Sequence, residues 1–129
     1  MDRPVVLVVE DEPIVAMHIA RIAIETGCEL GGIAAAGPEA LLIAESRPPA
    51  IALIDVRLMG RMDGIEVARK LHAQFGTLAI FITADAPSLS YLPLGFPYVA
   101  VVGKPFSHEA LEDALAEARV KLGAAASPA

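Results

Sequence analysis

Five polar residues stand where the chain leaves a short apolar segment. In chain order they are Glu10, Asp11, Asp55, Thr83 and Lys104. If the apolar segments form parallel strands of a doubly wound sheet, the carboxyl ends of those strands meet at one edge, which is where such sheets bind ligands. We therefore expect three carboxylates, one hydroxyl and one ammonium group to lie together at that edge.

This set of groups favours magnesium-dependent phosphoryl chemistry. Three neighbouring carboxylates repel one another unless a cation lies among them, and oxygen ligands suit Mg²⁺, which keeps several waters. Lys104 would neutralise a transferred phosphoryl group, and Thr83 would donate a hydrogen bond to it. Asp55 is then the candidate nucleophile and would become an aspartyl phosphate. The added charge would reposition Thr83 and the segment that follows it.

Short apolar segments alternate with longer helical segments along the chain. The pattern predicts strands at 5–9, 30–36, 50–55, 78–83 and 98–102. It predicts helices at 13–26, 38–46, 64–74 and 107–122. Continuously apolar strands that alternate with helices indicate an α/β fold, a doubly wound five-stranded parallel sheet with helices on both faces.

Two segments depart from this alternation. The segment between the last two predicted strands contains Pro87, Pro93 and Pro97, and interior prolines disfavour a regular helix. We therefore expect the fourth helix to be short or broken. We assign residues 1–122 to one domain and residues 123–129, "GAAASPA", to a flexible tail.

Composition excludes several classes of protein. The 129 residues are 55% hydrophobic and carry a net charge of −6 without a basic block, which argues against direct binding to nucleic acid. A single cysteine, Cys28, excludes an internal disulfide and fits a reducing compartment. No apolar segment is long enough for a signal sequence or a membrane span. We therefore expect a cytoplasmic domain that does not contact a membrane.

The ordered motifs resemble the receiver domain of two-component response regulators. They are "LVVEDEP" with Glu10 and Asp11, "LIDVRLMGRMDGIEVA" around Asp55, "FITA" with Thr83, and "VVGKPF" with Lys104. The resemblance covers residues 4 to 122. Each motif alone is common, but their order and spacing together are specific. The resemblance implies the flavodoxin-like strand order 2-1-3-4-5.

The resemblance also implies a metal site. Asp11 and Asp55 would bind Mg²⁺ directly, and Glu10 would act mainly through water. The backbone carbonyl of Arg57 would be a further protein ligand.

A phosphorylation site and its partners follow from the same resemblance. Asp55 would accept a phosphoryl group from a histidine kinase or a histidine phosphotransfer protein. Thr83 and Lys104 would then contact that group, and the Lys104–Pro105 peptide bond would be cis. A downstream protein, which the sequence does not identify, would read the change. The chain would not be an enzyme beyond its own phosphorylation and dephosphorylation.

Three positions depart from the family pattern. Met59 replaces a proline that often stands four residues after the phosphorylated aspartate, and the loop 55–64 is one residue longer than the commonest form. Val101 replaces the aromatic residue expected three positions before Lys104. Tyr98 lies too far along the strand to substitute for it directly, so coupling of Thr83 to an aromatic rotamer is in question.

Two alternative functions remain open from the sequence. One is a degenerate receiver that binds a protein constitutively, which the changes at Met59 and Val101 would fit. The other is a Mg²⁺-dependent phosphatase or phosphotransferase that uses an aspartyl nucleophile. Such enzymes commonly carry a second acid two residues after the nucleophile, where this chain has Arg57.

Overall fold

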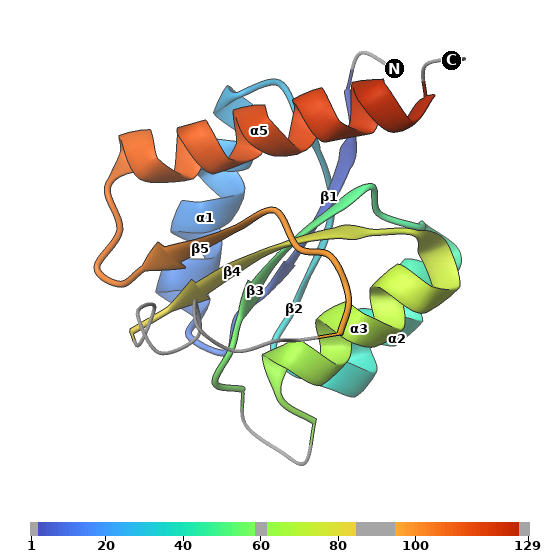
Figure 1. The fold of residues 1–129 in the computed structure, drawn as a ribbon. Helices are drawn as coiled ribbons and strands as arrows, with labels where there is room; N and C mark the ends of the chain where they lie inside the picture. Colours follow the sequence, from blue (N-terminus) through green and yellow to red (C-terminus); the bar gives the residue numbers. More distant parts are fainter. Residues whose placement is uncertain (1–2, 59–61, 85–94, 127–129) are drawn as a thin grey trace.

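The computed structural model describes residues 3–58, 62–84 and 95–126 of the chain. Its centre is one five-stranded parallel sheet with the order β2-β1-β3-β4-β5 (Figure 1). The strands are β1 Val5–Val9, β2 Glu29–Ala34, β3 Ile51–Asp55, β4 Leu78–Thr83 and β5 Ala100–Gly103. The helices are α1 Pro13–Glu25, α2 Gly37–Ser46, α3 Gly64–Phe75 and α5 His108–Ala126. The predicted fold class and strand order are confirmed.

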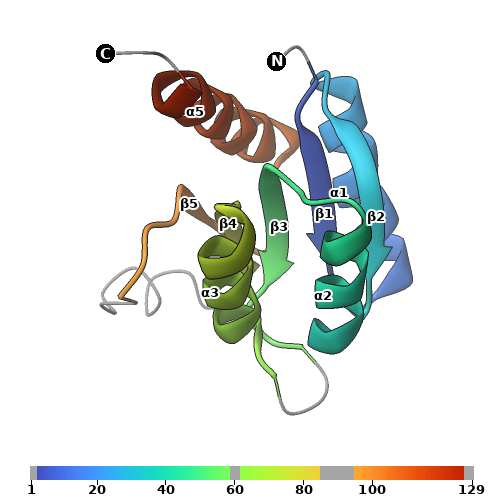
Figure 2. The ribbon, with the colours of Figure 1, turned by 90° about the vertical axis from the view of Figure 1, so that its right-hand side faces the viewer.

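The helices cover both faces of the sheet because each packs one apolar face against it (Figure 2). On one face, residues of α1 and α5 share a core with alternate strand residues such as Val6, Val8 and Ile80. On the other face, α2 and α3 pack against the intervening residues, such as Leu7, Ile54 and Phe81. Strands buried on both sides have no polar alternation, which explains their continuously apolar sequences.

Several element boundaries differ from the sequence-based expectation, those of β5 and α5 among them. β5 begins at Ala100, two residues later than predicted. α5 continues past Leu122 to Ala126, so that residues 123–126 are helical instead of part of a flexible tail. Alanine is the strongest helix former and outweighs the single Gly123 in this stretch. The predicted short or broken fourth helix falls largely in 85–94, outside the described residues.

Capping residues fix the ends of two helices, α3 and α5. Asp63 precedes α3 and its side chain accepts a hydrogen bond of 2.9 Å from the amide of Glu66, while Gly76 ends the helix with φ +71°. Ser107 caps α5 in the same way, by accepting a bond of 3.0 Å from the amide of Ala110. Such caps satisfy amides that the first turn of a helix leaves free.

Among the described residues, the helices are too short or too polar for any of them to cross a bilayer.

Candidate functional site

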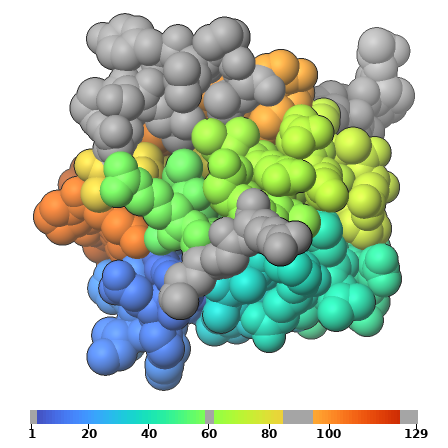
Figure 3. All heavy atoms as spheres, turned by 90° about the horizontal axis from the view of Figure 1, so that it is seen from below, coloured from blue at the N-terminus to red at the C-terminus, as the bar shows by residue number. Residues whose placement is uncertain are grey.

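The polar residues singled out in the sequence come from the carboxyl ends of four strands. Glu10 and Asp11 follow β1, Asp55 ends β3, Thr83 ends β4, and Lys104 follows β5. Parallel pairing holds these ends level, since Asp55 is opposite Ile82 and Thr83 is opposite Gly103. Seen from below, blue, green, yellow and orange segments of the chain meet on this face (Figure 3).

Lys104 joins two of the acids. Its Nζ lies 2.8 Å from Oε1 of Glu10 and 3.1 Å from Oδ2 of Asp55. The side chain of Glu10 is 0% exposed and that of Asp55 9% exposed, whereas that of Lys104 is 22% exposed. The ammonium group therefore covers two buried carboxylates from the solvent side, in contacts that are stronger than those of a surface ion pair.

The third acid, Asp11, completes a cluster with Glu10 and Asp55. One carboxylate oxygen from each lies within 4.8 Å of the others. The backbone also holds two of these carboxylates, because the amide of Glu12 donates to Oε2 of Glu10 at 3.1 Å and that of Arg57 donates to Oδ1 of Asp55 at 3.0 Å. The orientation of both acids is fixed before any ligand arrives.

Burial and charge shift two ionisation equilibria in the site. Burial raises the pKa of Glu10 above its ordinary value, against the opposing effect of the hydrogen bonds from Lys104 and the Glu12 amide. Burial alone would lower the pKa of Lys104, but its bonds to Glu10 and Asp55 outweigh that effect and the pKa is raised. Lys104 is therefore charged at neutral pH. Burial disfavours the ionised form of the Glu10 carboxyl group.

Thr83 and Lys104 are linked through the backbone as well. The amide of Lys104 donates to the carbonyl oxygen of Thr83 at 2.8 Å, and Thr83 is buried. The Lys104–Pro105 peptide bond is cis, as predicted. The hydroxyl-bearing end of β4 and the ammonium-bearing loop after β5 are thus adjacent.

Sequence reasoning missed the contribution of Gly64 to this site, because it treated this glycine only as a helix start. A Cβ placed on Gly64 would lie 2.0 Å from the carbonyl oxygen of Asp55. The amide of Gly64 also donates to the carbonyl of Val56 at 2.9 Å. The "DG" pair that opens α3 was the available signal, since a conspicuous glycine next to a loop can mark close backbone approach.

Four residues bear on the departures from the family pattern and on the alternative functions. Met59 lies outside the described residues, and Arg57 is exposed. Val101 is partly buried on the side of the sheet that α2 and α3 cover. Tyr98 packs there too, with its ring centroid 5.6 Å from that of Phe81.

The donor set fits a hard divalent cation. Three carboxylates at the open edge of the sheet offer oxygen ligands within reach of one ion, and the side chains offer neither sulfur nor imidazole. Mg²⁺ prefers such ligands and retains waters in its remaining positions. Glu10, Asp11 and Asp55 are the residues that would hold it.

Comparison with known proteins connects this geometry to a family. Residues 6–116 match the family described as "Response regulator receiver domain". The transcriptional regulatory protein PdtaR of Mycobacterium tuberculosis H37Rv is 33% identical over 98 residues, covering 67% of this chain and 47% of PdtaR. The phyllosphere-induced regulator PhyR of Methylorubrum extorquens is 35% identical over 80 residues, covering 61% of this chain and 30% of PhyR.

A solved structure supports the same relationship. The receiver domain of Erythrobacter litoralis PhyR superimposes with a TM-score of 0.83 at 27% identity, covering 93% of this chain and 92% of that domain. The chain spans less than half the length of the two curated relatives above. The resemblance therefore concerns their receiver portions.

Proposed function

The chain belongs to the response regulator receiver domain family of two-component signalling, and we propose that it is a phosphoacceptor switch whose Asp55 takes up a phosphoryl group. The observation that carries the proposal is the contact of Lys104 with both Glu10 and Asp55 at the mouth of the acidic cluster. An ammonium group in this position can transfer from a carboxylate to a phosphoryl oxygen without moving far.

The chemical step is a displacement at phosphorus. A carboxylate oxygen of Asp55 attacks the phosphorus of a phosphohistidine, a P–O bond forms, and the P–N bond breaks as the imidazole leaves with the electron pair and takes a proton. The donor would be a histidine kinase or a histidine phosphotransfer protein. A bound Mg²⁺ would supply positive charge that offsets the phosphoryl oxygens in this step.

The residues around Asp55 would stabilise the product. Lys104 would pair with the new phosphoryl group, and the Thr83 hydroxyl would donate to it. We assign direct metal ligation to Asp11 and Asp55, a water-mediated role to Glu10, and a backbone carbonyl ligand to Arg57. The chain would catalyse only its own phosphorylation and dephosphorylation.

The switch would act through contacts with other proteins. The phosphoryl group carries nearly two negative charges in place of the single charge of the Asp55 carboxylate, so Thr83 and Lys104 must adjust their positions. A downstream protein that recognises the adjusted surface would carry the signal.

Beryllofluoride, which imitates an aspartyl phosphate, tests the proposal directly. With Mg²⁺ present, we expect amide NMR shifts at Asp55, Thr83 and Lys104, because the new charge alters the hydrogen bonds of all three. Mg²⁺ alone and Mg²⁺ with fluoride are the controls. Absence of any shift beyond these controls would favour a constitutive binding module, and repeated turnover of a phosphate ester would favour an enzyme.

Removal of the ammonium group should tighten metal binding. Three carboxylates and Lys104 give the pocket a formal charge of −2, and Lys104→Gln changes it to −3. One additional charge a few ångströms away should strengthen Mg²⁺ binding by about 1–2 kcal/mol, which is roughly 5- to 30-fold in affinity. Calorimetric titration would measure the change.

The matched control for that measurement is Lys121→Gln. Lys121 is an exposed lysine of α5 that pairs with Glu117 at 3.4 Å, so its loss changes the net charge of the chain equally but not the charge of the pocket. Equal affinities for the two variants would show that Lys104 does not act on the metal site.

A further inference from the structure

Helix α1 carries apolar side chains on the face that the core does not cover. Its inner face buries a row of residues that includes Ile19, Ile22 and Ala23. On the outer face, Ile14 is 83% and Met17 66% exposed. Three polar residues, His18, Arg21 and Glu25, share that outer face. Large apolar side chains that gather on an exposed surface mark interaction sites.

The exposed face continues onto the edge of the sheet. β2 is an edge strand that pairs with β1 only. A groove between it and α1 is lined by the apolar side chains of Met17, Ile24, Leu30 and Ile33. We call these residues together with Ile14 the α1–β2 patch. By contrast, the other large apolar side chains exposed in the described part of the chain are Leu42 on α2 and Val120 on α5.

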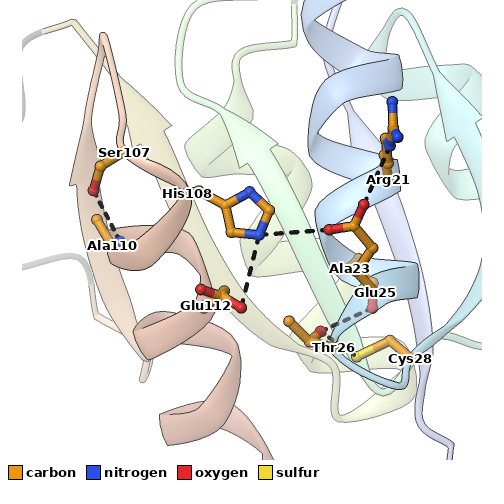
Figure 4. A network of polar contacts seen from close by, with 9 residues as sticks. All are labelled: Arg21, Ala23, Glu25, Thr26, Cys28, Ser107, His108, Ala110 and Glu112. Atoms are coloured by element: carbon orange, nitrogen blue, oxygen red, sulfur yellow. Dashed lines mark hydrogen bonds and ion pairs between the residues drawn. The ribbon is translucent and has the colours of Figure 1, made fainter.

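Two opposite charges stand in the middle of the patch. Arg21 and Glu25 line the same groove, and Nε of Arg21 lies 3.2 Å from Oε1 of Glu25 (Figure 4). Both side chains are accessible, at 80% and 46% exposed. The chain as a whole carries a charge of −6, whereas this pair is neutral. The net charge makes two copies of the chain repel each other overall, and the neutral pair adds nothing to that repulsion.

We propose that the α1–β2 patch is the interface of a symmetric dimer of this chain. Four of the exposed residues on α1, Ile14, Met17, Arg21 and Ile24, are spaced by 3, 4 and 3, which is the spacing of a seam between two helices. A two-fold axis makes an interface self-complementary. An apolar stripe that carries one positive and one negative residue is complementary to a second copy of itself related by a two-fold axis.

An antiparallel crossing of α1 on α1 satisfies both the apolar and the charged residues. With the axis near Ala20, Met17 of one copy faces Ile24 of the other, and the reverse pair forms by symmetry. Helical side chains lean toward the N-terminus of their own helix. Arg21 therefore leans toward the C-terminal end of the opposing helix, where Glu25 of the other copy lies. Each Arg21 can then contact both glutamates.

The patch is small, which limits the expected affinity. Interfaces that bury less than about 1,200 Å² in total are weak or transient. We expect a dissociation constant between about 10 µM and 1 mM. Sedimentation equilibrium of the unphosphorylated chain at about 0.15 M salt, where surface charges are partly screened, would measure it. This inference does not rest on phosphorylation of Asp55.

A charge exchange provides the sharpest test. Arg21→Glu places two acids from each copy at the crossing and should weaken self-association by about tenfold. Adding Glu25→Arg exchanges the two charges and should restore association, because the pair is again complementary to itself. Met17→Glu should weaken association to a similar degree by placing a charge in the apolar stripe.

Leu42→Glu is the matched control. Leu42 is as exposed as Met17, at 66%, so the substitution adds the same charge away from the patch and should leave association unchanged. Circular dichroism would establish that each variant is folded. A chain that stays monomeric up to about 1 mM, or a dimer that is insensitive to Arg21→Glu and Met17→Glu, would overturn the proposal.

Discussion

Replacing Asp55 with asparagine is expected to abolish phosphoryl transfer to the chain while the fold is retained. The amide is close in size to the carboxylate but is not a nucleophile, so no acyl phosphate can form. Its oxygen can still accept the 3.0 Å bond from the Arg57 amide. Incubation with a phosphorylated donor, followed by separation on a phosphate-binding gel, would measure the loss.

The same substitution should weaken Mg²⁺ binding, because one of the three clustered carboxylates is lost. Asp113→Asn is the control, since Asp113 is an exposed acid on α5. It changes the net charge equally and should leave both labelling and metal affinity unchanged. Labelling that persists in Asp55→Asn would move the phosphorylation site to another residue and contradict our assignment.

The arrangement of the site was predictable because the strands bring its residues together. Apolar segments that end in Asp55 and Thr83 could be recognised as buried parallel strands, and parallel strands place their carboxyl ends at one edge. The contacts within the site were not predictable in the same way. Sequence alone does not show that Glu10 is fully buried and lies closer to Lys104 than Asp55 does. That depends on side-chain packing over 94 residues of sequence separation.

Glycines were the least predictable part of the fold. "LGGIAAA" was expected to be a strand at 30–36, but β2 runs from Glu29 to Ala34. Its pairing with β1 skips Gly31, since Val6 is opposite Leu30 and Leu7 is opposite Gly32. A Cβ on Gly31 would lie 2.7 Å from the Val5 side chain. The bulge therefore leaves no room for a side chain at Gly31, and a single sequence does not reveal that restriction.

Gly64 makes the closest such contact, and we expect Gly64→Ala to be strongly destabilising. The added Cβ would lie 2.0 Å from the carbonyl oxygen of Asp55 and 2.8 Å from Cα of Val56. Both are backbone atoms of the strand end and its loop, so a side-chain rotation cannot relieve the clash. α3 would have to move away from β3. Overpacking of this severity should cost about 3 kcal/mol or more of unfolding free energy, measured by urea denaturation.

Gly123→Ala distinguishes this steric explanation from one based on helix propensity. Both glycines are helical, and replacing a helical glycine with alanine should by propensity alone stabilise the chain by about 0.5–1 kcal/mol. Apart from its chain neighbours and the backbone of its own helix, no atom of the described residues lies within 4 Å of a Cβ on Gly123, so we expect stabilisation there. Destabilisation at Gly64 and stabilisation at Gly123 would show that close packing against Asp55 decides the effect. Because the added Cβ would press against the backbone of Asp55, Gly64→Ala should also lower phosphoryl uptake. Equal stability of the two variants would contradict the steric explanation.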